Sequence, residues 1–236
     1  MAQKTTIHNE VPPMIRSSFH LLLPLALIAL IIASCSHGND MPKHRNHSFA
    51  NIESYEKRFE DPARITWQKP DEVVRAMGLK DGDTVADIGA GTGYFTRRIA
   101  KAVAPRGVAI GYDVERGMVE YMRADAKKLG YANYHAELVA PSAPALPRAG
   151  FTVIFMCNTY HHIENRPAYV RSIVPALKKA GRIVIVDSRM EAKAGPPKHF
   201  RIPKEVIVAE FAKAGMRLVK DLDFLPDQHY LEFARK

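Results

Sequence analysis

A glycine-rich turn that follows a buried strand constrains the fold of this chain more than any other feature of its sequence. The segment VADIGAGTGYF, residues 85–95, begins with apolar residues typical of a strand and continues through Gly89, Gly91 and Gly93. Glycine has no side chain, so the backbone turns sharply there and approaches a ligand closely. Asp113 lies 20 residues after Gly93, and an acid at that distance accepts hydrogen bonds from ribose hydroxyls. The combination indicates a ligand that contains a nucleoside.

From residue 51 onward, strand patterns alternate with helix patterns. Apolar runs predict strands at residues 84–88, 108–112, 134–139, 151–157, 182–186, 217–222 and 230–234. Periodic segments predict helices at residues 71–77, 93–103, 115–129, 166–177 and 204–214, and Pro175 should kink or break the fourth of them. This alternation predicts an α/β fold in which helices cover both faces of a mostly parallel sheet.

The spacing of the glycines distinguishes between two kinds of nucleoside ligand. A dinucleotide fingerprint is G-x-G-x-x-G, and its third glycine would fall on Tyr94. The spacing here is G-x-G-x-G, and Asp87 stands two residues before Gly89. A carboxylate at the end of the strand would repel a pyrophosphate but attract an ammonium group. These features favour S-adenosylmethionine, which has an ammonium group and no phosphate.

The stretch DIGAGTG, residues 87–93, resembles motif I of class I S-adenosylmethionine-dependent methyltransferases. Asp113 matches the acid that follows strand two in that family, residues 151–163 resemble its strand-four motif, and residues 180–183 its turn into strand five. The resemblance covers about residues 55–236 and implies a Rossmann-like, doubly wound, mostly parallel seven-stranded sheet with an antiparallel C-terminal strand. It also implies S-adenosyl-L-methionine as the cofactor and methyl transfer as the activity. The cofactor-binding residues that it implies are Asp87, Gly89, Ala90, Gly91, Gly93, Asp113, Val114 and Asn158.

The chain departs from the family pattern at several positions. Many relatives carry Gly-Asp after strand three, where this chain has Ala140-Pro141, and an aspartate early in strand four, where it has Thr152. The family pattern therefore does not identify which residue of this chain contacts the adenine amino group. The segment Asn158-Thr159-Tyr160 resembles the Asn/Asp-Pro-Pro-Tyr motif of amino-methylating enzymes only superficially, because both prolines are absent. This argues against an adenine or glutamine amide nitrogen as the methyl acceptor.

Two adjacent histidines are the candidate general bases. His161 and His162 follow the predicted strand 151–157, and ligands of open parallel sheets bind at the carboxyl ends of the strands. Histidine is suited to removing a proton from an acceptor near neutral pH. The alternative is that one of the two caps the next helix while the other packs. Asp187, at the end of the next strand, either lines the pocket or is an ordinary strand-end carboxylate.

Two other residues near the predicted pocket have more than one interpretation. Cys157 ends a buried strand and is interpreted as an unreactive core residue. Trp67 lies in a segment that precedes the first predicted helix, where such enzymes often carry a lid. Trp67 either covers the cofactor or packs on the edge of the domain. The spacing of the histidines predicts no metal site.

The distribution of charge bears on the chemical class of the methyl acceptor. The net charge is +9, but the basic residues are scattered among acidic ones, which favours a solvated surface over a nucleic-acid site. We expect a small-molecule or lipid acceptor and no nucleic acid. The alternative function is a non-catalytic module of the cell envelope that binds S-adenosylmethionine or another nucleoside.

The N-terminus has the features of an export signal. Residues 21–33 are all apolar, and Arg16 provides a positive flank. Thirteen residues are short for a transmembrane helix, which needs about 20, but suit a signal peptide. Small residues precede Cys35, as in a bacterial lipobox, so we expect residues 1–35 to be a signal peptide whose Cys35 is lipidated. Met14 is an alternative start.

These features predict the domain organisation and location. Residues 36–50 are polar and without periodicity, so we interpret them as a flexible linker to a methyltransferase domain at residues 51–236. The lipobox predicts a membrane-tethered lipoprotein that faces the periplasm. The alternative is a plain anchor in the inner membrane with the domain in the cytoplasm.

Overall fold

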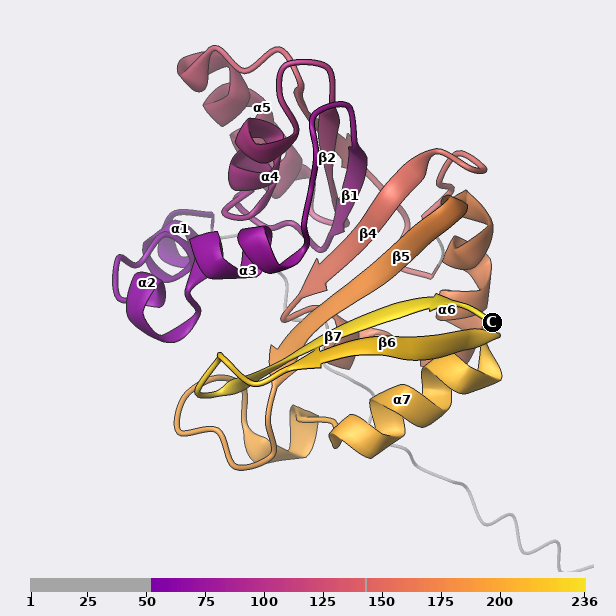
Figure 1. Ribbon diagram of the computed structural model, residues 1–236. Helices are drawn as coiled ribbons and strands as arrows, with labels where there is room; N and C mark the ends of the chain where they lie inside the picture. Colours follow the sequence, from indigo (N-terminus) through magenta and orange to yellow (C-terminus); the bar gives the residue numbers. More distant parts are fainter. Residues whose placement is uncertain (1–51, 143) are drawn as a thin grey trace, which may run out of the picture. The chain divides into compact units, whose positions relative to one another are not determined.

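The computed structural model describes residues 52–142 and 144–236 (Figure 1). The predicted signal peptide, the linker and the lipidation of Cys35 lie outside the described residues. Within the described part, no helix is long and apolar enough to cross a membrane. The helices and strands are α1 (Ile52–Phe59), α2 (Arg64–Trp67), α3 (Pro70–Ala76), β1 (Thr84–Ile88), α4 (Thr96–Val103), β2 (Val108–Asp113), α5 (Arg116–Leu129), β3 (Tyr134–Leu138), β4 (Phe151–Cys157), α6 (Arg166–Ile173), β5 (Leu177–Ser188), α7 (Lys204–Lys213), β6 (Met216–Leu222) and β7 (Gln228–Arg235), with 3₁₀ turns at Tyr160–His162, Val174–Ala176 and Lys198–Phe200.

The strands form one seven-stranded sheet in the order β3-β2-β1-β4-β5-β7-β6. The five strands from β3 to β5 pair in parallel, and β7 runs antiparallel to both of its neighbours. The chain proceeds from β1 toward one edge and then returns through β4 toward the other. The gap between the carboxyl ends of β1 and β4 is therefore the topological switch point, where ligands of such sheets bind. The predicted fold class is confirmed.

Helices cover the two faces of the sheet and give two cores (Figure 1). Side chains of α3, α4 and α5 pack on one face, and those of α6 and α7 on the other. Strand β4 contributes to both cores because successive side chains of a strand point to opposite faces. Val153 and Phe155 belong to the first core, and Ile154 and Met156 to the second. This double burial explains why β4 is a continuous apolar run.

Several element boundaries differ from the sequence prediction. Helix α4 begins at Thr96 rather than at residue 93 because the glycine loop continues through Gly93, which has a φ of +77°. Helix α6 ends at Ile173 and a 3₁₀ turn follows at Pro175, as the proline predicts. Helices α1 and α2 were not predicted at all. Helix α1 has eight residues and α2 only four, and no residue of α2 is buried, so each offers few turns of the apolar periodicity by which a helix is recognised in a sequence.

Candidate active site

The glycines of the loop pack so closely against other residues that side chains could not be accommodated at Gly89 and Gly93 without a shift. Gly89, Gly91 and Gly93 have φ values of +69°, +56° and +77°, in the left-handed region that favours glycine. A Cβ atom on Gly89 would lie 2.4 Å from the Cγ2 and Oγ1 atoms of Thr159, which follows β4. Any side chain at position 89 would therefore collide with Thr159 at the end of β4.

Asp113 lies at the end of β2 and forms a hydrogen bond with the glycine loop. Its Oδ2 atom accepts a hydrogen bond of 2.8 Å from the backbone N–H of Gly91, and its Oδ1 atom accepts one of 2.9 Å from the N–H of Glu115. The residue is 8% exposed, and burial raises the pKa of its carboxyl group. Each carboxylate oxygen accepts more than one hydrogen bond, so both retain capacity for hydroxyl groups of a ligand. The next residue, Val114, exposes apolar surface beside it.

Asp87 is a second buried acid, on β1. It is 3% exposed, and its Oδ2 atom accepts a hydrogen bond of 2.6 Å from the hydroxyl of Thr96. Burial raises the pKa of Asp87 to about 7, with a further contribution from the charge of Asp113. A cation placed beside Asp87 would favour the ionised carboxylate.

A buried polar network holds the carboxyl end of β4. Asn158 has a φ of +54°, and its Oδ1 atom accepts a hydrogen bond of 2.7 Å from Gln228 of β7. The amide of Gln68 donates to Gln228 and to the sulfur of Cys157. Burial raises the pKa of Cys157 well above that of an ordinary thiol, so its sulfur stays protonated and weakly nucleophilic at neutral pH. The network fixes Asn158 in a backbone conformation that is uncommon outside glycine and is frequent at functional sites.

The two histidines have different surroundings. His161 is buried, and its Nδ1 atom lies 2.7 Å from Oδ1 of Asp187, while its backbone N–H donates to Oδ2 at 3.2 Å. His162 is exposed, and its ring lies 4.1 Å from that of His161. In the tautomer in which Nδ1 donates its proton to Asp187, the Nε2 atom of His161 carries the lone pair. The pair has the arrangement of a general base and the group that orients it.

Comparison with known proteins identifies the family. Residues 79–217 match a family described as a methyltransferase domain. The chain belongs to this methyltransferase family. In solved structures it resembles a SAM-dependent methyltransferase from Aquifex aeolicus, with a TM-score of 0.71 and 26% identity over 76% of this chain and 96% of that one.

Two curated relatives are also methyltransferases by name. The ubiquinone/menaquinone biosynthesis C-methyltransferase UbiE of Ectopseudomonas mendocina is 25% identical over 166 residues, which are 64% of this chain and 58% of that protein. The demethylmenaquinone methyltransferase of Lactococcus lactis is 29% identical over 122 residues, or 50% of this chain and 46% of that protein. The chain thus spans about half the length of these relatives. Together with the family match, they confirm the predicted enzyme class and cofactor.

The residues of this methyltransferase fit S-adenosylmethionine. The loop glycines adopt the left-handed conformation without side chains at the ends of β1 and β2, Asp113 has acceptors for the ribose hydroxyls, and buried Asp87 suits the ammonium group. Val114 offers an apolar surface for the adenine ring. These contacts of individual residues stay predictions, as do those of Ala90 and Asn158.

The raised pKa of Asp87 predicts opposite effects of pH on folding and on binding. An aspartate of the unfolded chain has a pKa near 3.9, so the folded state holds this proton more tightly. The free energy of unfolding should therefore fall as pH rises from about 4 to about 7, and then level off. Affinity for S-adenosylmethionine should rise as pH rises through 7, because the ammonium group pairs with the ionised form.

The Asp87→Asn variant keeps an acceptor for Thr96 but has no charge. At pH 8 we expect it to be more stable than the wild type by on the order of a few kcal/mol and to bind S-adenosylmethionine about 10-fold more weakly. Denaturant unfolding and calorimetry between pH 5 and 8 measure both quantities. Unchanged affinity at pH 8 would remove Asp87 from the site.

The N-terminal segment supplies residues that the sequence analysis missed. Glu60, which follows α1, accepts hydrogen bonds from the hydroxyl of Thr92 at 2.5 Å and from Arg97 at 2.7 and 2.9 Å. A Cβ atom on Gly91 would lie 3.2 Å from the ring of Phe59. This segment therefore packs against the glycine loop. The only sequence signal for it was the interpretation of Trp67 as part of a lid.

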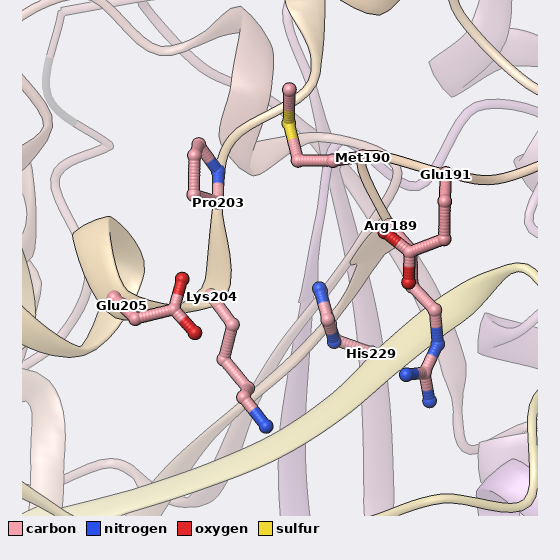
Figure 2. Close-up of a pocket in the computed structure, with 7 residues that line it drawn as sticks. All are labelled: Arg189, Met190, Glu191, Pro203, Lys204, Glu205 and His229. Atoms are coloured by element: carbon pink, nitrogen blue, oxygen red, sulfur yellow. The ribbon is translucent and has the colours of Figure 1, made fainter.

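A cavity of about 230 Å³ lies near the carboxyl end of β5 (Figure 2). Its lining residues come from the segment after β5, the start of α7 and β7: Arg189, Met190, Glu191, Pro203, Lys204, Glu205 and His229. Arg189 pairs with Asp223, and Lys204 with Asp221 at 2.8 Å, so carboxylates balance these cations. His229 is the register partner of Asp187, and directly paired residues project from the same face of a sheet. The cavity thus lies on the face that carries the His161–Asp187 pair.

Proposed function

We propose that this protein transfers the methyl group of S-adenosylmethionine to a small molecule whose hydroxyl group loses its proton to His161. The observation that carries the proposal is the buried contact of 2.7 Å between Nδ1 of His161 and Asp187. The pair lies at the carboxyl ends of β4 and β5, next to the strand β1 that leads into the glycine loop. A histidine oriented in this way favours catalysis over the alternative of a binding protein.

The acceptor that we propose is a phenolic or quinol ring that is methylated on carbon. The curated relatives are named for methylation in ubiquinone and menaquinone biosynthesis, which supports this class. S-adenosylmethionine supplies an electrophilic methyl group and leaves as S-adenosylhomocysteine. His161 accepts the proton of the ring hydroxyl at Nε2, which raises the electron density on the neighbouring ring carbon that forms the new bond. That carbon then loses its own proton to water.

Methyl transfer from labelled donor tests the proposal. The full-length protein would be incubated with S-[methyl-³H]adenosylmethionine and a demethylated quinol, with a phenol that is already substituted at the ring carbon as the control. We expect label in the first compound only, attached through carbon. Tight binding of the donor with no transfer to any quinol, phenol or lipid extract would support the alternative of a non-catalytic binding module.

We also propose that the protein is a lipoprotein tethered through Cys35. The short apolar run at residues 21–33 and the small residues before Cys35 support this, and a membrane-bound enzyme would have ready access to a lipid-soluble acceptor. Mass spectrometry of the mature protein should show diacylglycerol on Cys35 and no residues 1–34, and Cys35→Ser should release the protein from membranes. A mature chain that retains residues upstream of Cys35 would instead indicate an N-terminal anchor.

A further inference from the structure

The cavity beside β5 contains a buried histidine whose ring has no hydrogen-bond partner in the protein. His229 is 7% exposed and lines this cavity (Figure 2). Among residues 52–142 and 144–236, none forms a hydrogen bond or an ion pair with its imidazole ring. Buried polar groups of native proteins are nearly always hydrogen-bonded. An unpartnered ring on the wall of a cavity therefore points to a ligand that supplies the missing hydrogen bond.

The charges of the cavity wall are balanced, which argues against a charged ligand. Arg189 and Lys204 line the cavity, and each pairs with an aspartate. The side chains of Glu191 and Glu205 also belong to the wall. An added anion would therefore meet repulsion as well as attraction. A neutral polar group suits this wall better.

His229 is itself neutral near pH 7. Burial lowers the pKa of His229 below its ordinary value of 6.5, and the positive charges of Arg189 and Lys204 lower it further. Asp221 and Glu191 oppose this effect less strongly. A neutral imidazole has one N–H donor and one acceptor nitrogen. Such a ring matches a hydroxyl group, which can also donate and accept hydrogen bonds.

The cavity adjoins the proposed base but does not contain it. His229 is the register partner of Asp187 on β5, and the Cβ atoms of directly opposed residues are about 4.5–5.5 Å apart. Asp187 in turn lies 2.7 Å from Nδ1 of His161. His161 is not among the residues that line the cavity. A group bound in the cavity is therefore a different part of the acceptor from the hydroxyl that His161 deprotonates.

From this placement we infer that the cavity binds a second, unreactive hydroxyl group of the methyl acceptor and that His229 forms a hydrogen bond with it. The inference rests on the proposed function and narrows its acceptor to quinols, which carry two ring oxygens. The volume of about 230 Å³ is below the range of roughly 300–1,000 Å³ for sites that hold drug-sized molecules, so it suits part of a single ring. His229 is thus a specificity-determining residue that takes no part in proton transfer.

Binding of two ring compounds to the full-length protein tests the inference without turnover. The protein is saturated with S-adenosylhomocysteine and titrated with hydroquinone, which has two hydroxyl groups, or with phenol, which has one. The ¹⁵N signals of the histidine rings report the contact, and that of His229 is identified by its loss in His229→Leu. Hydroquinone should shift the His229 signal until the site is saturated.

Substitutions of His229 measure the contribution of the hydrogen bond. His229→Leu should weaken binding of hydroquinone about 3- to 10-fold, the usual effect of losing one hydrogen bond, and change that of phenol by no more than about 2-fold. His229→Gln keeps a donor and an acceptor and should recover part of the loss. His135→Leu is the matched control: His135 is exposed on β3, at the far edge of the sheet, and its loss should change neither affinity.

Three results would overturn the inference. A His229 signal that hydroquinone does not move would mean that the ring has no partner other than water. Equal losses for hydroquinone and phenol would make His229 a structural residue. A shift caused by benzoate but not by hydroquinone would make the cavity an anion site. Should His229→Leu fail to fold, His229→Gln identifies the signal and the titrations of the wild type decide.

The outcome can be separated from that of the proposed function. If no label is transferred to a demethylated quinol but hydroquinone still contacts His229, the binding site stands and the proposed function alone fails. If label is transferred while hydroquinone leaves the His229 signal unmoved, the inference alone fails.

Discussion

Replacing His161 by alanine is expected to lower kcat by about 10²- to 10⁴-fold, the usual contribution of a general base. Affinity for S-adenosylmethionine should change little, because the residue acts on the acceptor. The expected loss follows from our proposal that Nδ1 donates to Asp187 across the contact of 2.7 Å, so that Nε2 is the ring nitrogen that accepts the proton. Steady-state kinetics with the demethylated quinol, together with calorimetry of the donor, separate the two effects.

Two variants sharpen this prediction. Asp187→Asn removes the charge that orients the ring and should lower kcat by a smaller factor than the loss of His161. His162→Ala is the matched control: its ring lies 4.1 Å from that of His161, but its side chain is exposed. A loss for His162→Ala as large as for His161→Ala would show that the dyad is not the base. Full activity in both histidine variants would assign proton removal to another group or to water.

The Gly91→Val variant should lose at least about 100-fold in affinity for S-adenosylmethionine. The φ of +56° at Gly91 costs an L-residue about 1–2 kcal/mol, and a β-branched side chain is more restricted still. A Cβ atom there would also lie 3.2 Å from the ring of Phe59, so the added methyl groups must displace either this ring or the ligand. Calorimetry of the purified variant measures the loss.

Gly78→Val separates the backbone effect from the loss of the site. Gly78 has a φ of +58°, close to that of Gly91, and no atom lies within 4 Å of a Cβ built there. It lies just beyond the end of α3 and away from the loop. This variant should have a lower thermal stability, as Gly91→Val should, but bind the donor normally. Normal donor binding by Gly91→Val would show that the glycine loop does not contact the ligand.

The sheet and the donor loop were predictable because their signals are local. Buried strands are recognised by their apolar runs, and the turn between β1 and α4 is recognised by its three glycines. The structure of residues 84–95 can therefore be predicted from these residues alone. The seven strands were all expected, and the order of the sheet follows from the family that the motif resembles. Asp113 was predictable because it comes at the end of a recognisable strand.

The polar contacts around the donor site had no such signal. Gln68 reaches Gln228 across 160 positions of the chain and Cys157 across 89, and a hydrogen bond between distant side chains imposes no pattern on the residues between them. The contacts of Glu60 with Thr92 and Arg97 were missed for the same reason, and because α1 and α2 are short. The sequence could not choose between His161 and His162, since they are neighbours in a 3₁₀ turn. Our proposal of His161 rests on its contact with Asp187, a residue from another strand.

A crystal structure of the full-length protein with S-adenosylhomocysteine tests the central claim most directly, namely that the carboxyl ends of β1, β2 and β4 hold the methyl donor. We expect the ribose hydroxyls within hydrogen-bonding distance of the Asp113 carboxylate, at about 2.5–3.0 Å. The amino-acid end should lie over the glycine loop beside Asp87, and the sulfur should face the end of β4. A ligand bound elsewhere, or a ribose that does not contact Asp113, would contradict this account of the site.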